Sequence, residues 1–151
     1  EMDSHLGVFH DHYLAHIADL SRPFPDAVGV IKELRRAGAK TVICTNKREA
    51  SSRLLIGKLG LDDLFEAIVG MDTAGAPKPD PAPVRLCLER AGVARGVFIG
   101  DSDTDVKAAK AAGLPVLIAE FGYGPVTLAR DAFATFNSFR ALPALIRKAL
   151  R

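Results

Sequence analysis

The sequence predicts an α/β fold, a three-layer Rossmann-like parallel sheet with helices on both faces. Short apolar runs rich in β-branched residues alternate along the chain with segments of helical periodicity. Strands and helices that alternate at this spacing form βαβ units, and such units build parallel sheets. Two of the apolar runs also end abruptly in polar residues, at Thr45-Asn46 and at Gly100-Asp101. Ligands of open α/β sheets bind outside such strand ends.

Length and composition fit one globular domain. The chain has 151 residues, of which 48% are hydrophobic and 25% charged. Its net charge of +2 is too small to indicate a nucleic-acid or membrane partner. No apolar run approaches the roughly 18 residues that a membrane span needs. Cys44 and Cys87 each lie inside an apolar segment, so we expect two reduced core thiols and a cytoplasmic protein.

The N-terminal segment has helical periodicity, which predicts a helix over residues 4–20. Its apolar stripe consists of Leu6, Phe9, Tyr13, Leu14, Ile17 and Leu20. His12 and His16 are four residues apart and could share a metal. No Glu follows His12 as a zinc-protease helix requires, so we expect a solvated helix face. Pro23 and Pro25 end this segment.

The remaining elements follow in regular alternation. We expect strands over residues 41–44, 96–100, 114–119 and 134–136, and a short strand within residues 64–70. We expect helices over residues 26–37, 48–59, 81–91, 106–112, 125–131 and 139–151. Asp26 and Asp103 are candidate N-caps, and Gly38, Gly60 and Gly113 follow helix ends. The loop over residues 71–83 is rich in Gly and Pro.

Two polar segments precede the acidic turn. Thr45 and Asn46 follow a buried strand, and the N–H groups of the next helix lie just beyond, which suits a phosphate oxygen. Thr and Asn also cap helices, and capping alone would explain the pair. Lys78 has Pro77 and Pro79 as neighbours, so its backbone is stiff and its charge could neutralise a phosphate. The alternative is an exposed loop lysine.

The acidic turn after residues 96–100 is a candidate cation site. Asp101 leaves the strand first, where Mg²⁺ could bind one or two carboxylates, waters and a substrate phosphate. Asp105, four residues on, can orient the site from behind. A calcium loop would need Gly at its sixth position and Glu at its twelfth, where this chain has Val106 and Ala112. We therefore exclude a calcium loop.

Taken in order, these three segments resemble the motifs of the haloacid dehalogenase-like hydrolases, most of all the phosphoglycolate phosphatase-like branch. The resemblance extends from about Phe9 to Arg151 and rests on Thr45-Asn46, on Lys78-Pro79, and on the Gly-Asp-Ser-x-x-Asp of residues 100–105. It implies phosphate binding by Thr45, Asn46 and Lys78. It implies that Lys78, Asp101 and Asp105 are catalytic. It also implies Mg²⁺ ligation by Asp101, with Asp105 supporting the metal or reaching it through water.

The chain departs from this family at its first motif. That motif, Asp-x-Asp followed by x and Thr or Val on an N-terminal strand, supplies the nucleophile and the general acid. This chain has no match to it. We therefore expect residues 1–22 to be the remnant of a helical cap and residues 23–151 to be a Rossmann-like core without its first, central strand. The implied explanation is a truncated chain whose upstream residues are absent.

A missing central strand would leave the strands 41–44 and 96–100 with unpaired backbone groups. We therefore expect a fragment of a larger ordered protein, a gap filled by a partner or by the chain's own N-terminal segment, or poor stability. A homodimer stays open.

The resemblance implies a Mg²⁺-dependent phosphatase for a small phosphorylated metabolite such as 2-phosphoglycolate, inactive as this fragment. The alternative is a truncated, non-catalytic homologue that binds a phosphorylated ligand or a protein partner. A receiver-like module is a third alternative. A receiver has its acidic residues before its Thr and Lys, whereas here Thr45 and Lys78 precede Asp101. That order favours the hydrolase.

Overall fold

The computed structural model describes residues 6–11, 26–120 and 126–151, and it contains one parallel sheet of six strands. The strand order across the sheet is β3-β2-β1-β4-β5-β6, and every pair is parallel. The strands are β1 (Leu6–Asp11), β2 (Lys40–Cys44), β3 (Ala67–Val69), β4 (Arg95–Gly100), β5 (Val116–Ala119) and β6 (Ala134–Phe136). The predicted α/β class and parallel sheet are therefore confirmed.

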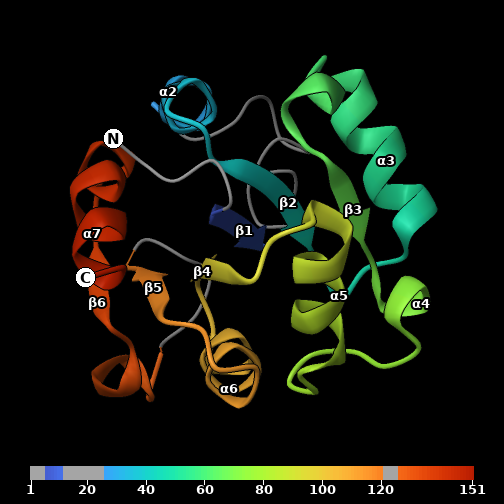
Figure 1. The fold of residues 1–151 in the computed structure, drawn as a ribbon. Coiled ribbons are helices and arrows are strands. Elements are labelled where there is room, and N and C mark those ends of the chain that lie inside the picture. Colours follow the sequence, from blue (N-terminus) through green and yellow to red (C-terminus); the bar gives the residue numbers. More distant parts are fainter. Residues whose placement is uncertain (1–5, 12–25, 121–125) are drawn as a thin grey trace.

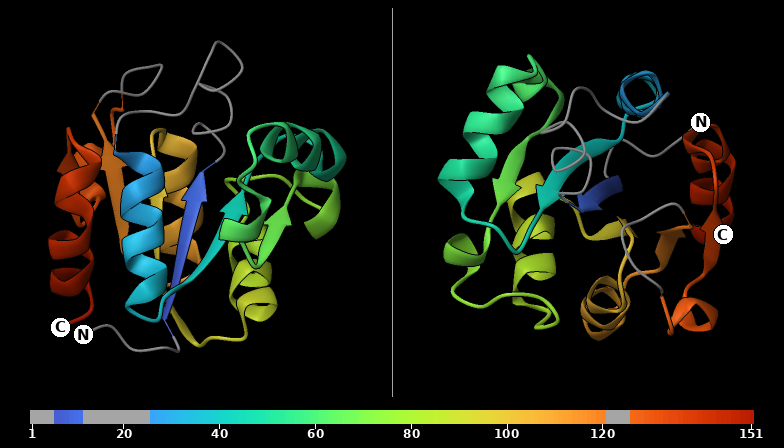
Figure 2. Two further views of the ribbon diagram at one scale, coloured as in Figure 1. Left: turned by 90° about the horizontal axis from the view of Figure 1, so that it is seen from above. Right: turned by 180° about the vertical axis from the view of Figure 1, so that it is seen from behind.

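Helices cover both faces of this sheet (Figures 1 and 2). The α-helices are α2 (Ala27–Arg36), α3 (Glu49–Lys58), α4 (Met71–Ala74), α5 (Ala82–Ala91), α6 (Asp103–Ala111) and α7 (Leu142–Ala149). Helices α2 and α7 pack over Val8 of β1, and α3 packs over Ile43 of β2 on the same side. Helices α5 and α6 pack over Phe9 and Val42 on the opposite side. The three-layer arrangement follows from strands that are apolar on both faces.

The segment Leu6–Asp11 forms β1, so the predicted helix over residues 4–20 is wrong for these six residues. Val8 and Phe9 are adjacent and both fully buried, one in the core under α2 and the other in the core under α5. A central strand buries two successive side chains on opposite faces, which a one-sided surface helix cannot do. Residues 12–20, with the hypothesis of a metal shared by His12 and His16, lie outside the described residues.

Strand β1 occupies the centre of the sheet, where the sequence predicted a gap. Its backbone pairs with β2 on one side, Val8 opposite Thr41, and with β4 on the other, Val8 opposite Val97. The chain's own N-terminal segment therefore fills the place of the central strand. This removes the reason for expecting a partner's strand there. The division of the chain at residue 22 and the homodimer stay predictions.

A pair of glycines lets β1 fit between its neighbours. Gly7 lies opposite Gly96 in the register of β1 and β4. The ring of Phe9 covers both, because a Cβ built on Gly7 would lie 2.5 Å from Phe9 Cζ and one on Gly96 would lie 2.7 Å from Phe9 Cε2. The space that two side chains would take is thus filled by one buried aromatic ring.

Several element ends differ from the sequence predictions. Asp26 precedes α2 with φ of 66° and makes no side-chain cap, so it does not act as the predicted N-cap. Ser102, and not Asp103, caps α6. The predicted helix over residues 125–131 is a short 3₁₀ turn, Ala129–Asp131, in its described part. A 3₁₀ turn over Phe139–Ala141 precedes α7, and α4 was not predicted.

Within residues 6–11, 26–120 and 126–151, none of the helices combines the length and the apolar character that a membrane crossing requires.

Candidate functional site

Strands β2, β1 and β4 lie side by side and parallel, so their carboxyl ends meet at one edge of the sheet (Figure 1). Thr45 follows β2 and Asp101 follows β4. Between them, Asp11 ends β1 opposite Cys44, while His10 lies opposite Ile99. The backbone of Asp11 is therefore level with the residue before Thr45. The sequence reasoning, which assigned this segment to a helix, did not consider Asp11.

Lys78 reaches into this edge from the loop between α4 and α5. Only 5% of the residue is exposed, so the alternative of an exposed loop lysine is wrong. Its Nζ donates to Asp105 Oδ1 at 2.7 Å and to the carbonyl oxygen of Cys44 at 3.2 Å, and it lies 5.3 Å from the ring centre of Phe98. A buried ammonium needs such partners, since an uncompensated charge is costly away from water. The structure thus places a fixed positive charge between β2 and β4.

Asp105 is fully buried at the start of α6 and joins Lys78 to the acidic turn. Its Oδ1 accepts from Lys78, and its Oδ2 accepts from the backbone N–H of Asp101 and from Ser102 Oγ, both at 3.0 Å. Gly100 makes this approach feasible, because a Cβ there would lie 2.4 Å from Asp105 Oδ2. Both carboxylate oxygens are therefore engaged inside the protein, which favours the supporting role for Asp105 over direct metal ligation.

Asp101 is half-buried at the mouth of the same turn, directly after β4. No group of three or more His, Cys, Asp or Glu side chains that could hold a metal occurs in the part of the chain that the structure describes. A Mg²⁺ ion needs no such cage, because one or two carboxylates, waters and a substrate phosphate can complete its octahedron. The hard oxygen ligand of Asp101, beside a second carboxylate whose charge Lys78 balances, fits a Mg²⁺ ion of that kind.

Thr45 and Asn46 have different surroundings although they are neighbours. Thr45 is buried, and its Oγ1 accepts from the N–H of Lys47 at 3.0 Å, so its own proton can be donated to a ligand. The side chain of Asn46 contacts the main chain of Lys78 twice. Neither residue caps α3, whose N-cap is Arg48, so capping does not explain the pair.

Asp103 lies outside this cluster. Its carboxylate accepts from Thr127 Oγ1 at 2.6 Å and from the N–H of Leu128 at 2.9 Å. The hydrogen bond from Thr127, followed by that from Leu128, holds the pKa of Asp103 below its ordinary value. The residue ties α6 to the segment before β6.

Sequence reasoning also missed partners that complete the site. Ser102 was treated only as part of the motif, although it both caps α6 and donates to Asp105. The spacing Ser-x-x-Asp before a helical segment is the signature of a capping box and could have revealed this role. The carbonyl of Cys44 and the ring of Phe98, which also surround Lys78, carry no motif that a sequence could show.

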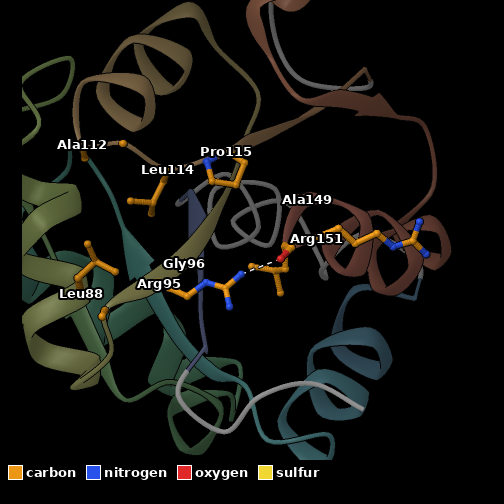
Figure 3. A pocket seen from close by; sticks show the side chains of 11 residues that line it. Leu88, Arg95, Gly96, Ala112, Leu114, Pro115, Ala149 and Arg151 are labelled. Atoms are coloured by element: carbon orange, nitrogen blue, oxygen red, sulfur yellow. Dashed lines mark hydrogen bonds between the residues drawn. The ribbon is translucent and has the colours of Figure 1, made fainter.

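A cavity of about 250 Å³ lies elsewhere, beside the amino ends of β4 and β5 (Figure 3). Gly96, Pro115 and Ala149 are among its lining residues, and Arg95 Nη2 donates to the carbonyl of Leu150 at 2.7 Å across it. Because Arg95 begins β4 and Asp101 follows its end, this cavity is at the opposite edge of the sheet from the candidate site.

The sequence profile of the haloacid dehalogenase-like hydrolases matches residues 2–113 of the chain. This is most of the chain. The chain belongs to the haloacid dehalogenase-like hydrolase family. The match includes every residue of the cluster at the carboxyl ends of β2 and β4, from Thr45 to Asp105.

Curated relatives agree with this family. The chain is 45% identical over 125 residues to a phosphoglycolate phosphatase of Mesorhizobium japonicum, an alignment that covers 82% of this chain and 55% of the relative. It is 38% identical over 150 residues to the plasmid phosphoglycolate phosphatase of Cupriavidus necator, covering 95% of this chain and 64% of the relative. The chain thus spans between about half and two thirds of the length of these relatives.

Solved structures agree with the fold. A predicted phosphoglycolate phosphatase from Haemophilus somnus superposes with a TM-score of 0.76 at 25% identity, covering 82% of this chain and 57% of that one. CbbY from Rhodobacter sphaeroides, solved in complex with phosphate, gives a TM-score of 0.73 at 27% identity, covering 82% and 58%. These structures are what the chain is similar to, and they carry the Rossmann-like fold.

Proposed function

We propose that this chain is the phosphate- and metal-binding part of a Mg²⁺-dependent phosphatase for a small phosphorylated metabolite, with 2-phosphoglycolate as the first candidate substrate. The observation that carries the proposal is the position of Lys78. Its ammonium is buried at the carboxyl edge of the sheet, held by Asp105 and the carbonyl of Cys44, between Thr45 and Asp101. The names of the relatives support the choice of substrate.

The chain's own residues can bind and orient a phosphoryl group at this edge. Thr45 Oγ1 can donate to a phosphate oxygen, whereas at the start of α3 the N–H of Glu49 already donates to Asp72 Oδ1. The charge of Lys78 stabilises the phosphoryl oxygens electrostatically. A bound Mg²⁺ would neutralise phosphoryl charge from the side of Asp101. Asp105 fixes both the ammonium and the turn that carries Asp101.

Cleavage needs a nucleophile as well as a phosphate site. The sequence has no Asp-x-Asp-x-Thr or Asp-x-Asp-x-Val motif before Thr45. Therefore we propose that the 151 residues bind phosphate in the presence of Mg²⁺ but do not turn over a phosphomonoester. The second candidate function, a non-catalytic protein that binds a phosphorylated ligand, shares this site and lacks only the reaction.

Calorimetry and a turnover assay on the same preparation test both parts. We expect the chain to bind inorganic phosphate more tightly with Mg²⁺ than without it. Asp101→Asn should lower the affinity for Mg²⁺, and Asp80→Asn, at an exposed position of the Lys78 loop, is the matched control. No release of phosphate from 2-phosphoglycolate or p-nitrophenyl phosphate is expected.

Each failure has a distinct meaning. If the chain binds neither phosphate nor Mg²⁺, the proposed site is wrong. Strong Mg²⁺-dependent turnover by the 151 residues would refute the proposal that this chain cannot cleave a phosphomonoester. If Asp11→Asn then abolished that turnover, the nucleophilic carboxylate would be that of Asp11, which ends β1. Turnover that appears only in an upstream-extended chain would favour the phosphatase over the non-catalytic alternative.

A further inference from the structure

Asn46 contacts Lys78 through both ends of its side-chain amide. Its Nδ2 donates to the carbonyl oxygen of Lys78 at 3.0 Å, and its Oδ1 accepts from the backbone N–H of Lys78 at 2.8 Å. The amide thus pairs with the main chain of one residue as one backbone strand pairs with another. We call this pair of hydrogen bonds the Asn46–Lys78 clamp.

The clamp joins two segments that are distant in sequence. Asn46 follows β2, and Lys78 lies in the loop between α4 and α5. On the far side of the same lysine, the ammonium contacts Asp105 and the carbonyl of Cys44. The main chain of Lys78 is therefore fixed from β2 while its side chain crosses toward the turn after β4.

Fixing the main chain decides where the ammonium lies. A lysine has a long, flexible stem, and holding it in one conformation has a large entropy cost. The surrounding protein lowers this cost when it fixes the main chain and encloses the stem. Only 3% of the Lys78 side chain is exposed. The amide of Asn46 uses one of its two N–H donors and its carbonyl oxygen on the main chain of Lys78, which fixes its orientation toward that residue.

We infer that Asn46 is a positioning residue, which acts on bound phosphate through Lys78 and does not itself bind phosphate. This inference rests on the proposed function for its phosphate readout only. It replaces the direct phosphate contact that the resemblance implied for Asn46. The geometry of the clamp also makes a prediction that needs no ligand, because loosening the main chain of Lys78 should release its buried ammonium.

The experiment compares Asn46→Ala and Asn46→Asp with Asn137→Ala, the same change at the exposed asparagine after β6. The Asp variant keeps an acceptor for the N–H of Lys78 but loses the donor to its carbonyl. Acetylation of Lys78 by an amine-reactive ester is followed by mass spectrometry, with exposed Lys107 as the internal standard. Alkylation of the buried Cys87 thiol, measured in parallel, reports global unfolding.

We expect acetylation of Lys78 to rise several-fold in both Asn46 variants, with Cys87 still protected, and to stay unchanged in Asn137→Ala. Affinity for inorganic phosphate should fall by about tenfold, the size that one or two ordinary hydrogen bonds produce. Affinity for Mg²⁺ should not change, because the two hydrogen bonds of the Asn46 amide go to the main chain of Lys78 and not to Asp101 or Asp105. In a Lys78→Gln background, Asn46→Ala should cause no further loss of phosphate affinity.

Three results overturn the inference. The first is unchanged acetylation of Lys78 in the Asn46 variants. The second is a joint rise in Lys78 acetylation and Cys87 alkylation, which would mean that Asn46 only stabilises the fold. The third is a loss of phosphate affinity that adds to that of Lys78→Gln, which would make Asn46 a direct ligand. If Lys78→Gln does not fold, or if the unsubstituted chain binds no phosphate, the acetylation measurements still decide whether the clamp positions Lys78.

Discussion

Lys78 Nζ lies 2.7 Å from Asp105 Oδ1, and both side chains are almost completely buried. The pair connects the loop before α5 to the first turn of α6, so two of the three segments with a predicted role meet in one ion pair. Removal of one partner from a buried pair leaves an uncompensated charge, which is more costly than the loss of an exposed salt bridge.

The first prediction concerns this ion pair. Lys78→Met and Asp105→Asn should each lower the free energy of unfolding by about 3 kcal/mol, as for other buried pairs. The double variant should lose less than the sum of the two, because neither charge is then left alone. Urea denaturation measures all three. Arg53→Met, which breaks the exposed pair with Glu49, is the control and should change stability by less than about 1 kcal/mol. Additive losses would contradict a direct interaction between Lys78 and Asp105.

The second prediction concerns Gly100, which ends β4. A Cβ at this position would lie 2.4 Å from Asp105 Oδ2 and 2.5 Å from Asp105 Cβ, so the carboxylate must move. Gly100→Ala should therefore cost about 1–3 kcal/mol of stability and weaken phosphate binding. Gly57→Ala is the matched control, because nothing lies within 4 Å of its added Cβ and the position is inside α3. That change should raise stability by about 0.5–1 kcal/mol. Equal thermal midpoints for the two variants would argue against the close packing at Gly100.

The third prediction concerns acid stability. Glu66 precedes β3, and its Oε1 accepts from Arg35 Nη1 at 2.8 Å and from the N–H of Thr41 at 2.9 Å. Partial burial raises the pKa of Glu66, but the hydrogen bonds from Arg35 and Thr41 outweigh burial and leave the pKa below its usual 4.5. A carboxyl group with a lowered pKa in the folded state stabilises the fold above pH 4.5, and this contribution is lost as the pH falls through the folded-state value.

Glu66→Gln should accordingly flatten the dependence of unfolding free energy on pH below 4.5, with the loss of stability already present at pH 7. Equilibrium unfolding at a series of pH values measures this slope. Glu33→Gln, which removes an exposed carboxyl group on α2, serves as the control. An identical slope in Glu66→Gln and the unsubstituted chain would show that the contacts of Glu66 do not contribute.

The fourth prediction concerns the two thiols. Cys44 and Cys87 are both fully buried in the core between the sheet and α5. Burial, followed by a hydrogen bond with Cys44, raises the pKa of the Cys87 thiol well above 9.0. Since the thiolate is the reactive form, Cys87 should react with a disulfide reagent such as dithionitrobenzoate only after unfolding. In guanidinium chloride the reagent should release two equivalents of thionitrobenzoate per chain, and in the native state it should release almost none. Rapid reaction of native Cys87 would contradict its position.

The sequence predicted the parts of the fold in which one pattern dominates. The runs 41–44 and 96–100 carry no charge and centre on β-branched or aromatic residues, and they form β2 and β4 near the expected positions. The segment 6–11 was assigned wrongly because Leu6 and Phe9 have helical spacing while Val8 and Phe9 suit a doubly buried strand. Local periodicity cannot decide between a helix and a strand for this segment, because the need for a strand between β2 and β4 is a property of the whole sheet.

The candidate site shows a similar division. Thr45, Lys78, Asp101 and Asp105 could be selected from their motifs, and the fold brings them to one edge of the sheet. The sequence could not show that Lys78 is buried, that the two oxygens of Asp105 have internal partners, or that the amide of Asn46 contacts the main chain of Lys78. Those contacts depend on the path of the loop over residues 71–83, which Gly and Pro make hard to predict from residue pattern.

Strand β1 comes first in sequence among the described elements, and it is one of the two middle strands of the sheet. Gly7 pairs with Lys40 on one side and with Gly96 on the other, so one partner is made early in synthesis and the other much later. During translation the early strands would therefore present an open edge until β4 has left the ribosome. Pairing over such sequence distances is slow, and exposed strands invite association with other chains. We expect the yield of folded protein to depend on chaperones that shield this edge. Slowing synthesis after β4 should improve this yield more than slowing synthesis before β4.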